Sequence, residues 1–125
     1  MQQSPFIYWI ENNSATLSST AFTIISDKSN TIFLSIASIW EMQIKMQIGK
    51  LKLVNDLSVV VEEQQQVNEM QLLSIAPQHI YNLNQLPFHH KDPFDRMLLA
   101  QAMTESFSLL SKDTMFAAYP VNVIW

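Results

Sequence analysis

Short apolar segments rich in β-forming residues alternate with helical patterns along this chain, and this alternation limits the folds open to it. Apolar residues recur at helical spacing over residues 18–27, 36–48, 57–69, a short stretch from Pro77 and a longer one from Pro93. The segments between them predict strands over residues 31–34, 71–75, 108–111 and 121–125. Strands that alternate with helices favour an α/β fold, in which a parallel sheet is covered by helices on both faces.

Capping residues mark the ends of the predicted helices. Ser35 precedes the second helix and Gly49 follows it, which are the residue types that begin and end helices most often. Asp92 stands directly before Pro93, and this Asp-Pro pair is the strongest helix start in the chain. We therefore interpret Asp92 as a helix cap rather than as a metal ligand.

The composition excludes several classes of function. The chain has 125 residues, so we expect one domain over residues 1–125. Its single glycine rules out a P-loop, a dinucleotide-binding GxGxxG motif and a GxSxG nucleophile motif, because each needs at least two glycines. Without cysteine, disulfides, thiolate metal sites and a cysteine nucleophile are also ruled out. The net charge of −4 argues against binding nucleic acid by bulk charge, although a local basic patch stays open.

The sequence carries no sign of export or of a membrane span. The apolar stretch over residues 6–10 is too short for a signal peptide and has no basic residues before it. No apolar run approaches the length that crosses a bilayer. We therefore expect a cytoplasmic protein with no membrane partner.

Three acidic residues follow the predicted strands in positions that favour a shared site. Asp95 lies in the first turn of its helix, and Asp113 comes just after the strand over residues 108–111. Glu41 lies six residues into the helix after residues 31–34, or about 9 Å along its axis. Ligand sites collect at the carboxyl edge of a parallel sheet, so we expect the three carboxylates to converge there. A Mg²⁺ or Mn²⁺ ion would relieve their repulsion and would suit attack of water on a phosphodiester.

Each of these residues also has an ordinary structural interpretation. Glu41 could form a solvated pair with Lys45 at i+4. Asp95 could serve only in a capping box, and Asp113 could cap a turn over residues 114–118. Spacing alone leaves these alternatives open.

Histidine and lysine pairs give weaker signals. His89 and His90 are adjacent, so their side chains diverge and a metal-binding pair is not expected. Lys45, Lys50 and Lys52 form a small basic cluster, which is either a solvated face or a patch for a phosphate backbone.

Three motifs, in order along nearly the whole chain, resemble PIN-domain proteins of the VapC toxin type. The first is Ser35-Ile-Ala-Ser-Ile-Trp-Glu41, continuing through Lys45 to Leu51. The second is Leu86-Pro-Phe-His-His-Lys-Asp-Pro-Phe-Asp95-Arg96, continuing to Ala102. The third is Ser111-Lys-Asp113, followed by the closing segment to Trp125.

This resemblance implies a three-layer α/β/α fold with a parallel sheet of about five strands. It implies a Mg²⁺- or Mn²⁺-dependent endoribonuclease, usually the toxin of a type II toxin–antitoxin pair. Glu41, Asp95 and Asp113 would hold the metal and help activate water, and Ser111, Lys45 and Arg96 are the candidate substrate-binding residues. The implied partners are RNA, a cognate antitoxin and a second copy of the chain.

The beginning of the chain departs from the family pattern. The family begins with an apolar strand followed by Asp-Thr-His, and counting back from residues 6–9 places Gln2, Gln3 and Ser4 at those three positions. We therefore expect the first strand to be missing and its Asp to be replaced by Gln2, which would impair activity. The alternative is a non-catalytic PIN-like module that still binds antitoxin or RNA.

Overall fold

The computed structural model describes residues 4–8, 17–88, 92–112 and 114–125. Its elements begin with β1 (Ser4–Tyr8) and end with β5 (Val123–Ile124). Between them lie α1 (Ser19–Ser26), β2 (Asn30–Ser35), α2 (Ile36–Gln47), α3 (Leu57–Val67), β3 (Gln71–Leu73), α4 (Pro77–Tyr81), η2 (Asn82–Gln85), α5 (Pro93–Glu105), β4 (Ser108–Leu110) and η3 (Thr114–Ala118). Every helix and strand predicted above is present, with its ends shifted by a few residues. None of the described helices combines the length and the apolar character needed to cross a membrane.

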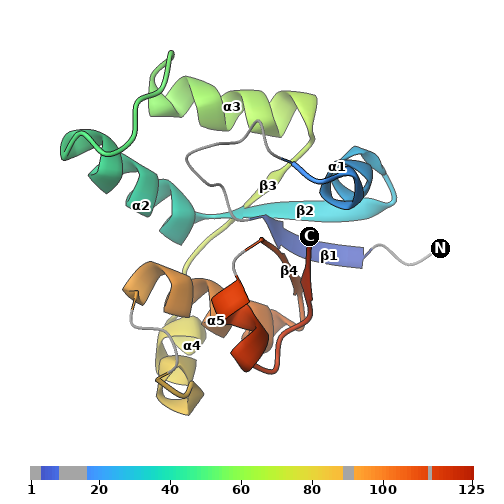
Figure 1. Ribbon diagram of the computed structural model, residues 1–125, viewed down its shortest axis with the longest axis vertical. Coiled ribbons are helices and arrows are strands. Elements are labelled where there is room, and N and C mark those ends of the chain that lie inside the picture. Colours follow the sequence, from blue (N-terminus) through green and yellow to red (C-terminus); the bar gives the residue numbers. More distant parts are fainter. Residues whose placement is uncertain (1–3, 9–16, 89–91, 113) are drawn as a thin grey trace.

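The five strands form one parallel sheet in the order β3-β2-β1-β4-β5 (Figure 1). The expectation that the first strand is missing is therefore wrong, because residues 4–8 form β1 at the centre of the sheet. Pro5 concealed this strand, since proline cannot donate to a ladder and is rare in central strands. It is tolerated near the start of β1, where pairing with β4 begins only at Phe6.

The expectation that Gln2 replaces the family's first Asp stays a prediction. Ligand-bearing residues follow the carboxyl ends of strands in such a sheet, and β1 ends at Tyr8. Gln2 lies outside the described residues, but it precedes β1 in the chain, and Ser4 opens that strand. Ser4 therefore lies within the first described strand and not after its carboxyl end.

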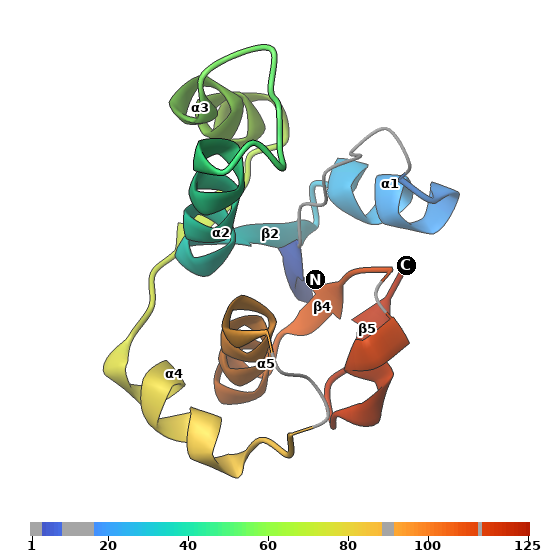
Figure 2. The same cartoon turned by 60° about the vertical axis from the view of Figure 1, so that its left-hand side comes forward.

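Hydrophobic residues fill both faces of the sheet. Phe6 and Tyr8 of β1 belong to one buried cluster and Ile7 to the other, because successive side chains of a strand point to opposite faces. The first cluster includes residues of α1 and α3, and the second includes most of the buried residues of α5. Figures 1 and 2 show these helices on opposite sides of the sheet, which gives the three-layer α/β/α arrangement.

Two helices meet beyond the sheet edge and define the site. Helix α2 starts at Ser35, directly where β2 ends, and extends away from the sheet (Figure 1). It stops at Gly49, whose φ of 76° is the left-handed conformation that glycine adopts at helix ends. Helix α5 starts at Asp92, whose Oδ1 accepts hydrogen bonds from the backbone N–H groups of Phe94 (2.8 Å) and Asp95 (3.2 Å). The cap predicted at Asp92 is thereby confirmed.

Candidate functional site

Three carboxylates meet at the junction of α2 and α5. Glu41, Asp92 and Asp95 each offer one oxygen atom, and these three oxygens lie within 4.8 Å of one another. Glu41 is only 7% exposed and Asp95 only 5%, while Asp92 is half-buried. Like charges at this separation and burial repel one another strongly unless a cation lies among them.

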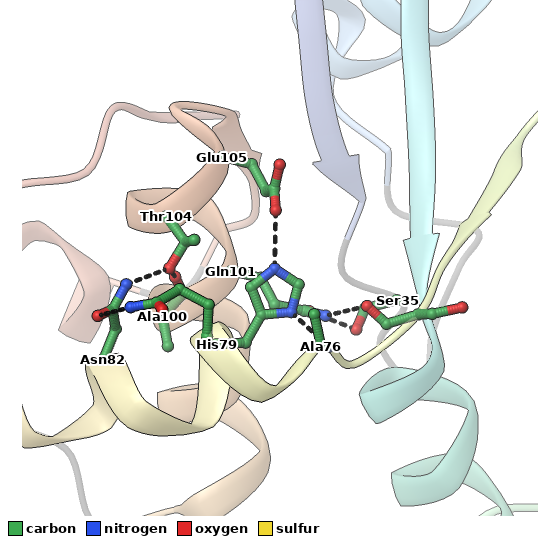
Figure 3. A network of polar contacts seen from close by, with 10 residues as sticks. Ser35, Ala76, His79, Asn82, Ala100, Gln101, Thr104 and Glu105 are labelled. Carbon is green, nitrogen blue, oxygen red and sulfur yellow. Dashed lines mark hydrogen bonds and ion pairs between the residues drawn. The ribbon is translucent and has the colours of Figure 1, made fainter.

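A buried hydrogen bond between Ser35 and Gln101 joins the start of α2 to α5. The Ser35 hydroxyl donates to Gln101 Oε1 over 2.5 Å, and Gln101 Nε2 donates to the backbone carbonyl of Ser74 (Figure 3). Glu41 comes six residues after Ser35, and Asp95 comes six residues before Gln101. Each interval spans about 9 Å of helix. The two helices therefore run in opposite directions past each other. They approach at two places, where Ser35 lies beside Gln101 and where Glu41 lies beside Asp95.

A second polar contact network holds α4 against α5. His79 is buried, and its Nδ1 accepts a hydrogen bond from the backbone N–H of Ala76. Its Nε2 lies 2.9 Å from Glu105 Oε1, so the acceptor role of Nδ1 leaves the ring proton on Nε2, facing the carboxylate. One turn along, Asn82 Nδ2 donates to Thr104 Oγ1 (Figure 3). These contacts support the C-terminal end of α5, whereas the carboxylate cluster lies at its first turn.

Lys45 balances part of the negative charge. Its Nζ lies 3.9 Å from Glu41 Oε2, one turn further along α2. The solvated-pair alternative describes the Lys45 side chain, which is one-third exposed, but not the Glu41 side chain, which is buried. Lys45 therefore supplies a positive charge next to one member of the cluster.

The donor set fits a hard divalent cation. Mg²⁺ binds oxygen at about 2.1 Å, so the oxygens that hold one ion lie at most about 4.2 Å apart, and the three oxygens here would have to move closer together to hold it. Asp92 can cap α5 and still offer an oxygen, because a carboxylate has two. One turn before Glu41, Ser38 buries a hydroxyl that has no hydrogen-bond partner among the residues described. Water or a ligand satisfies such a group.

The remaining predicted site residues are placed as follows. Asp113 lies outside the described residues, as do His89 and His90. Ser111 is buried just after β4, and its backbone N–H donates to the carbonyl of Ile124. Lys50 is exposed beyond the end of α2.

Arg96 stabilises the segment that precedes α5. Its guanidinium donates to the carbonyls of Leu83, Leu86 and Pro87, and it lies 4.2 Å above the ring of Phe88. Arg96 is also buried. Its donors therefore hold the segment that leads into α5.

Asp92 is the cluster member that the sequence did not indicate. Helix capping by one carboxylate oxygen is enough to account for the Asp92-Pro93 pair. The sequence therefore offers no separate reason to assign a role to the second oxygen of Asp92. The signal lies in its spacing, because residues three apart at a helix start lie on the same side as one another. Asp92 and Asp95 have this spacing.

One family model, described as PIN domain, matches residues 4–122 of the chain. No curated protein matches the chain.

Several solved structures share the fold. The VapBC2 structure from Rickettsia felis, bound to a DNA fragment from its promoter, matches with a TM-score of 0.70 at 13% identity, covering 96% of this chain and 97% of that one. A structure of FitAB bound to an IR36 DNA fragment gives 0.62 at 16% identity, covering 95% and 93%. FitAcB from Neisseria gonorrhoeae gives 0.63 at 17% identity, covering 96% of each chain.

Proposed function

Because this chain belongs to the PIN domain family, we propose that it is a Mg²⁺- or Mn²⁺-dependent endoribonuclease and the toxin of a type II toxin–antitoxin pair. The observation that carries the proposal is the cluster of Glu41, Asp92 and Asp95, whose oxygens lie within 4.8 Å of one another. Carboxylates placed this closely repel one another, and a divalent cation bound among them would relieve that repulsion.

The chain's own residues have separate tasks in this proposal. Glu41, Asp95 and Asp113 would hold the metal, and Asp92 would be a further ligand. The bound ion supplies the positive charge that activates water and stabilises the developing charge on the phosphodiester. Burial of Glu41 and Asp95 fixes their oxygens and keeps bulk water from competing with them. Lys45, which is one-third exposed, would present its ammonium group to a phosphate of the RNA, whereas Ser111 is buried and would support the site from below the surface.

Partners follow from the same family membership. The VapBC2 and FitAB structures hold DNA, and their folds cover nearly the whole of this chain. We propose that this chain likewise binds a cognate antitoxin protein and forms a homodimer.

Cleavage of RNA by the purified chain tests the function. We expect cleavage with Mg²⁺ or Mn²⁺, none with a chelator, and a loss of orders of magnitude in Asp95→Asn. Asp56→Asn is the matched control, because Asp56 is an exposed carboxylate that makes no side-chain cap bond at the start of α3. Cleavage that survives chelation, or that Asp95→Asn leaves intact, contradicts the proposal. Metal and RNA binding without cleavage would identify the non-catalytic module instead.

A further inference from the structure

A large exposed aromatic side chain stands beside the carboxylate cluster. Trp40 is 58% exposed although it lies in the middle of a helix that packs against α5. Its ring meets the ring of Phe94 edge to face, with centroids 5.0 Å apart and planes at 88°. Phe94 therefore holds the indole in one orientation while most of its surface stays in contact with water.

The backbone ties this aromatic pair to the proposed metal site. Trp40 immediately precedes Glu41, and Phe94 lies between Asp92 and Asp95 in the chain. The backbone N–H of Phe94 donates to Asp92 Oδ1 over 2.8 Å. Trp40 and Phe94 are thus each one residue away in the chain from a member of the cluster, one on each of the two helices that form it.

The surroundings favour a nucleobase over an apolar peptide as the occupant. An apolar groove does run along α2, but it is lined by Ile39 and Gln43 with Leu57, Ser58, Val61 and Glu62, and Trp40 is not part of it. Lys45 lies further along α2, and the exposed Lys50 follows the end of that helix; both suit the phosphates of a nucleic-acid chain. An aromatic ring next to cations and a phosphodiester-cleaving centre is the combination by which proteins bind unpaired RNA bases.

We propose that Trp40, held by Phe94, stacks an unpaired base of the nucleotide next to the scissile phosphodiester. The inference rests on the proposed ribonuclease function and adds a base-binding position to it. Since every base has an aromatic face, this position favours single-stranded RNA over duplex without selecting one base.

Binding of two labelled probes to the full-length chain tests the proposal. The probes are single-stranded heptaadenylate and a seven-unit ribose-phosphate strand without bases, both measured by fluorescence anisotropy with Ca²⁺ in place of Mg²⁺. We expect Trp40→Ala to weaken binding of heptaadenylate by about 5- to 150-fold and to leave binding of the abasic strand unchanged. Trp40→Phe should keep most of the affinity, because phenylalanine still offers a ring.

Phe22→Ala is the matched control, because Phe22 is a similarly exposed aromatic residue on α1. We expect this variant to bind both probes as the wild type does. Circular dichroism and thermal unfolding establish that each variant is folded. If Trp40→Ala is not folded, Trp40→Leu replaces it, because leucine keeps an apolar side chain without an aromatic face, and the same loss of heptaadenylate binding is expected.

The outcomes separate this inference from the proposed function. If the wild type cleaves RNA but Trp40→Ala binds heptaadenylate normally, the stacking site is refuted and the ribonuclease stands. Equal loss for both probes also refutes stacking, because the effect would not depend on a base. A change in the oligomeric state of Trp40→Ala, with unchanged RNA affinity, assigns Trp40 to a protein interface and overturns the inference. If the wild type neither binds nor cleaves RNA, both proposals fail.

Discussion

The hydroxyl of Ser35 makes two contacts that join separate parts of the structure. It donates to Gln101 Oε1 over 2.5 Å and accepts from the backbone N–H of Ala37 over 3.1 Å. Both Ser35 and Gln101 are fully buried. One hydroxyl therefore caps α2 and also fixes its position against α5, where the carboxylates meet.

Replacing Ser35 should damage both stability and metal binding. Ser35→Ala removes the cap and leaves Gln101 Oε1 buried without its donor, so we expect a loss of about 2–4 kcal/mol in the free energy of unfolding. We also expect weaker Mn²⁺ binding, measured by isothermal titration calorimetry. The variant loses the hydrogen bond that joins α2, which carries Glu41, to α5, which carries Asp95. Ser18→Ala removes only a cap, at α1, and should cost about 1 kcal/mol without changing Mn²⁺ affinity. Equal Mn²⁺ affinity in both variants would show that the link does not position the site.

Asp92→Asn separates capping from charge. Asparagine caps helices about as well as aspartate, so the free energy of unfolding without metal should stay the same or rise as repulsion in the cluster falls. Mn²⁺ affinity should fall, because one carboxylate oxygen of the cluster is lost. Urea unfolding and Mn²⁺ titration measure the two effects. Unchanged Mn²⁺ affinity would return Asp92 to the role of a cap alone.

Lys45→Gln should strengthen metal binding while it weakens RNA binding. The Lys45 ammonium group lies 3.9 Å from Glu41 Oε2 and competes with a cation for that carboxylate. We expect Mn²⁺ affinity to rise a few-fold and affinity for heptaadenylate to fall. Lys28→Gln is the control, since Lys28 pairs with Glu69 at an exposed position and should change neither quantity. Weaker Mn²⁺ binding in Lys45→Gln would mean that the lysine orders Glu41 rather than competing for it.

Arg96→Lys should destabilise the fold rather than abolish RNA binding. Lysine cannot reproduce the fork that donates to three carbonyls, so we expect the free energy of unfolding to fall by about 2–4 kcal/mol. Affinity of the folded protein for heptaadenylate should stay close to that of the wild type. A large loss of RNA affinity with normal stability would place Arg96 in the substrate site, as its motif position suggests.

Much of the fold could be predicted because local signals agree with the tertiary structure. Ser35 and Gly49 do begin and end α2, and the Asp92-Pro93 pair does begin α5. The central strand could not be predicted, because Pro5 argues locally against a strand and only the later pairing of β1 with β2 and β4 decides the matter.

The chemistry of the site could be predicted from the sequence, but the full set of residues that form it could not. Glu41 interrupts an apolar helix and Asp95 lies in a first turn, so both could be named from the sequence. Their approach depends on how α2 packs against α5, and the Ser35–Gln101 hydrogen bond between these parts of the chain joins residues 66 positions apart, so it leaves no local pattern. Asp92 could not be added, because its cap already accounted for the residue.

The central place of β1 in the sheet affects how the chain folds while it is synthesised on the ribosome. Phe6 is made roughly a hundred residues before Ser108, with which it is paired. During synthesis the β2-facing edge of β1 can be closed soon, while the other edge stays open until β4 has emerged. The nascent chain therefore passes through a long period with an open strand edge, and during that period chaperones have their best opportunity to bind it.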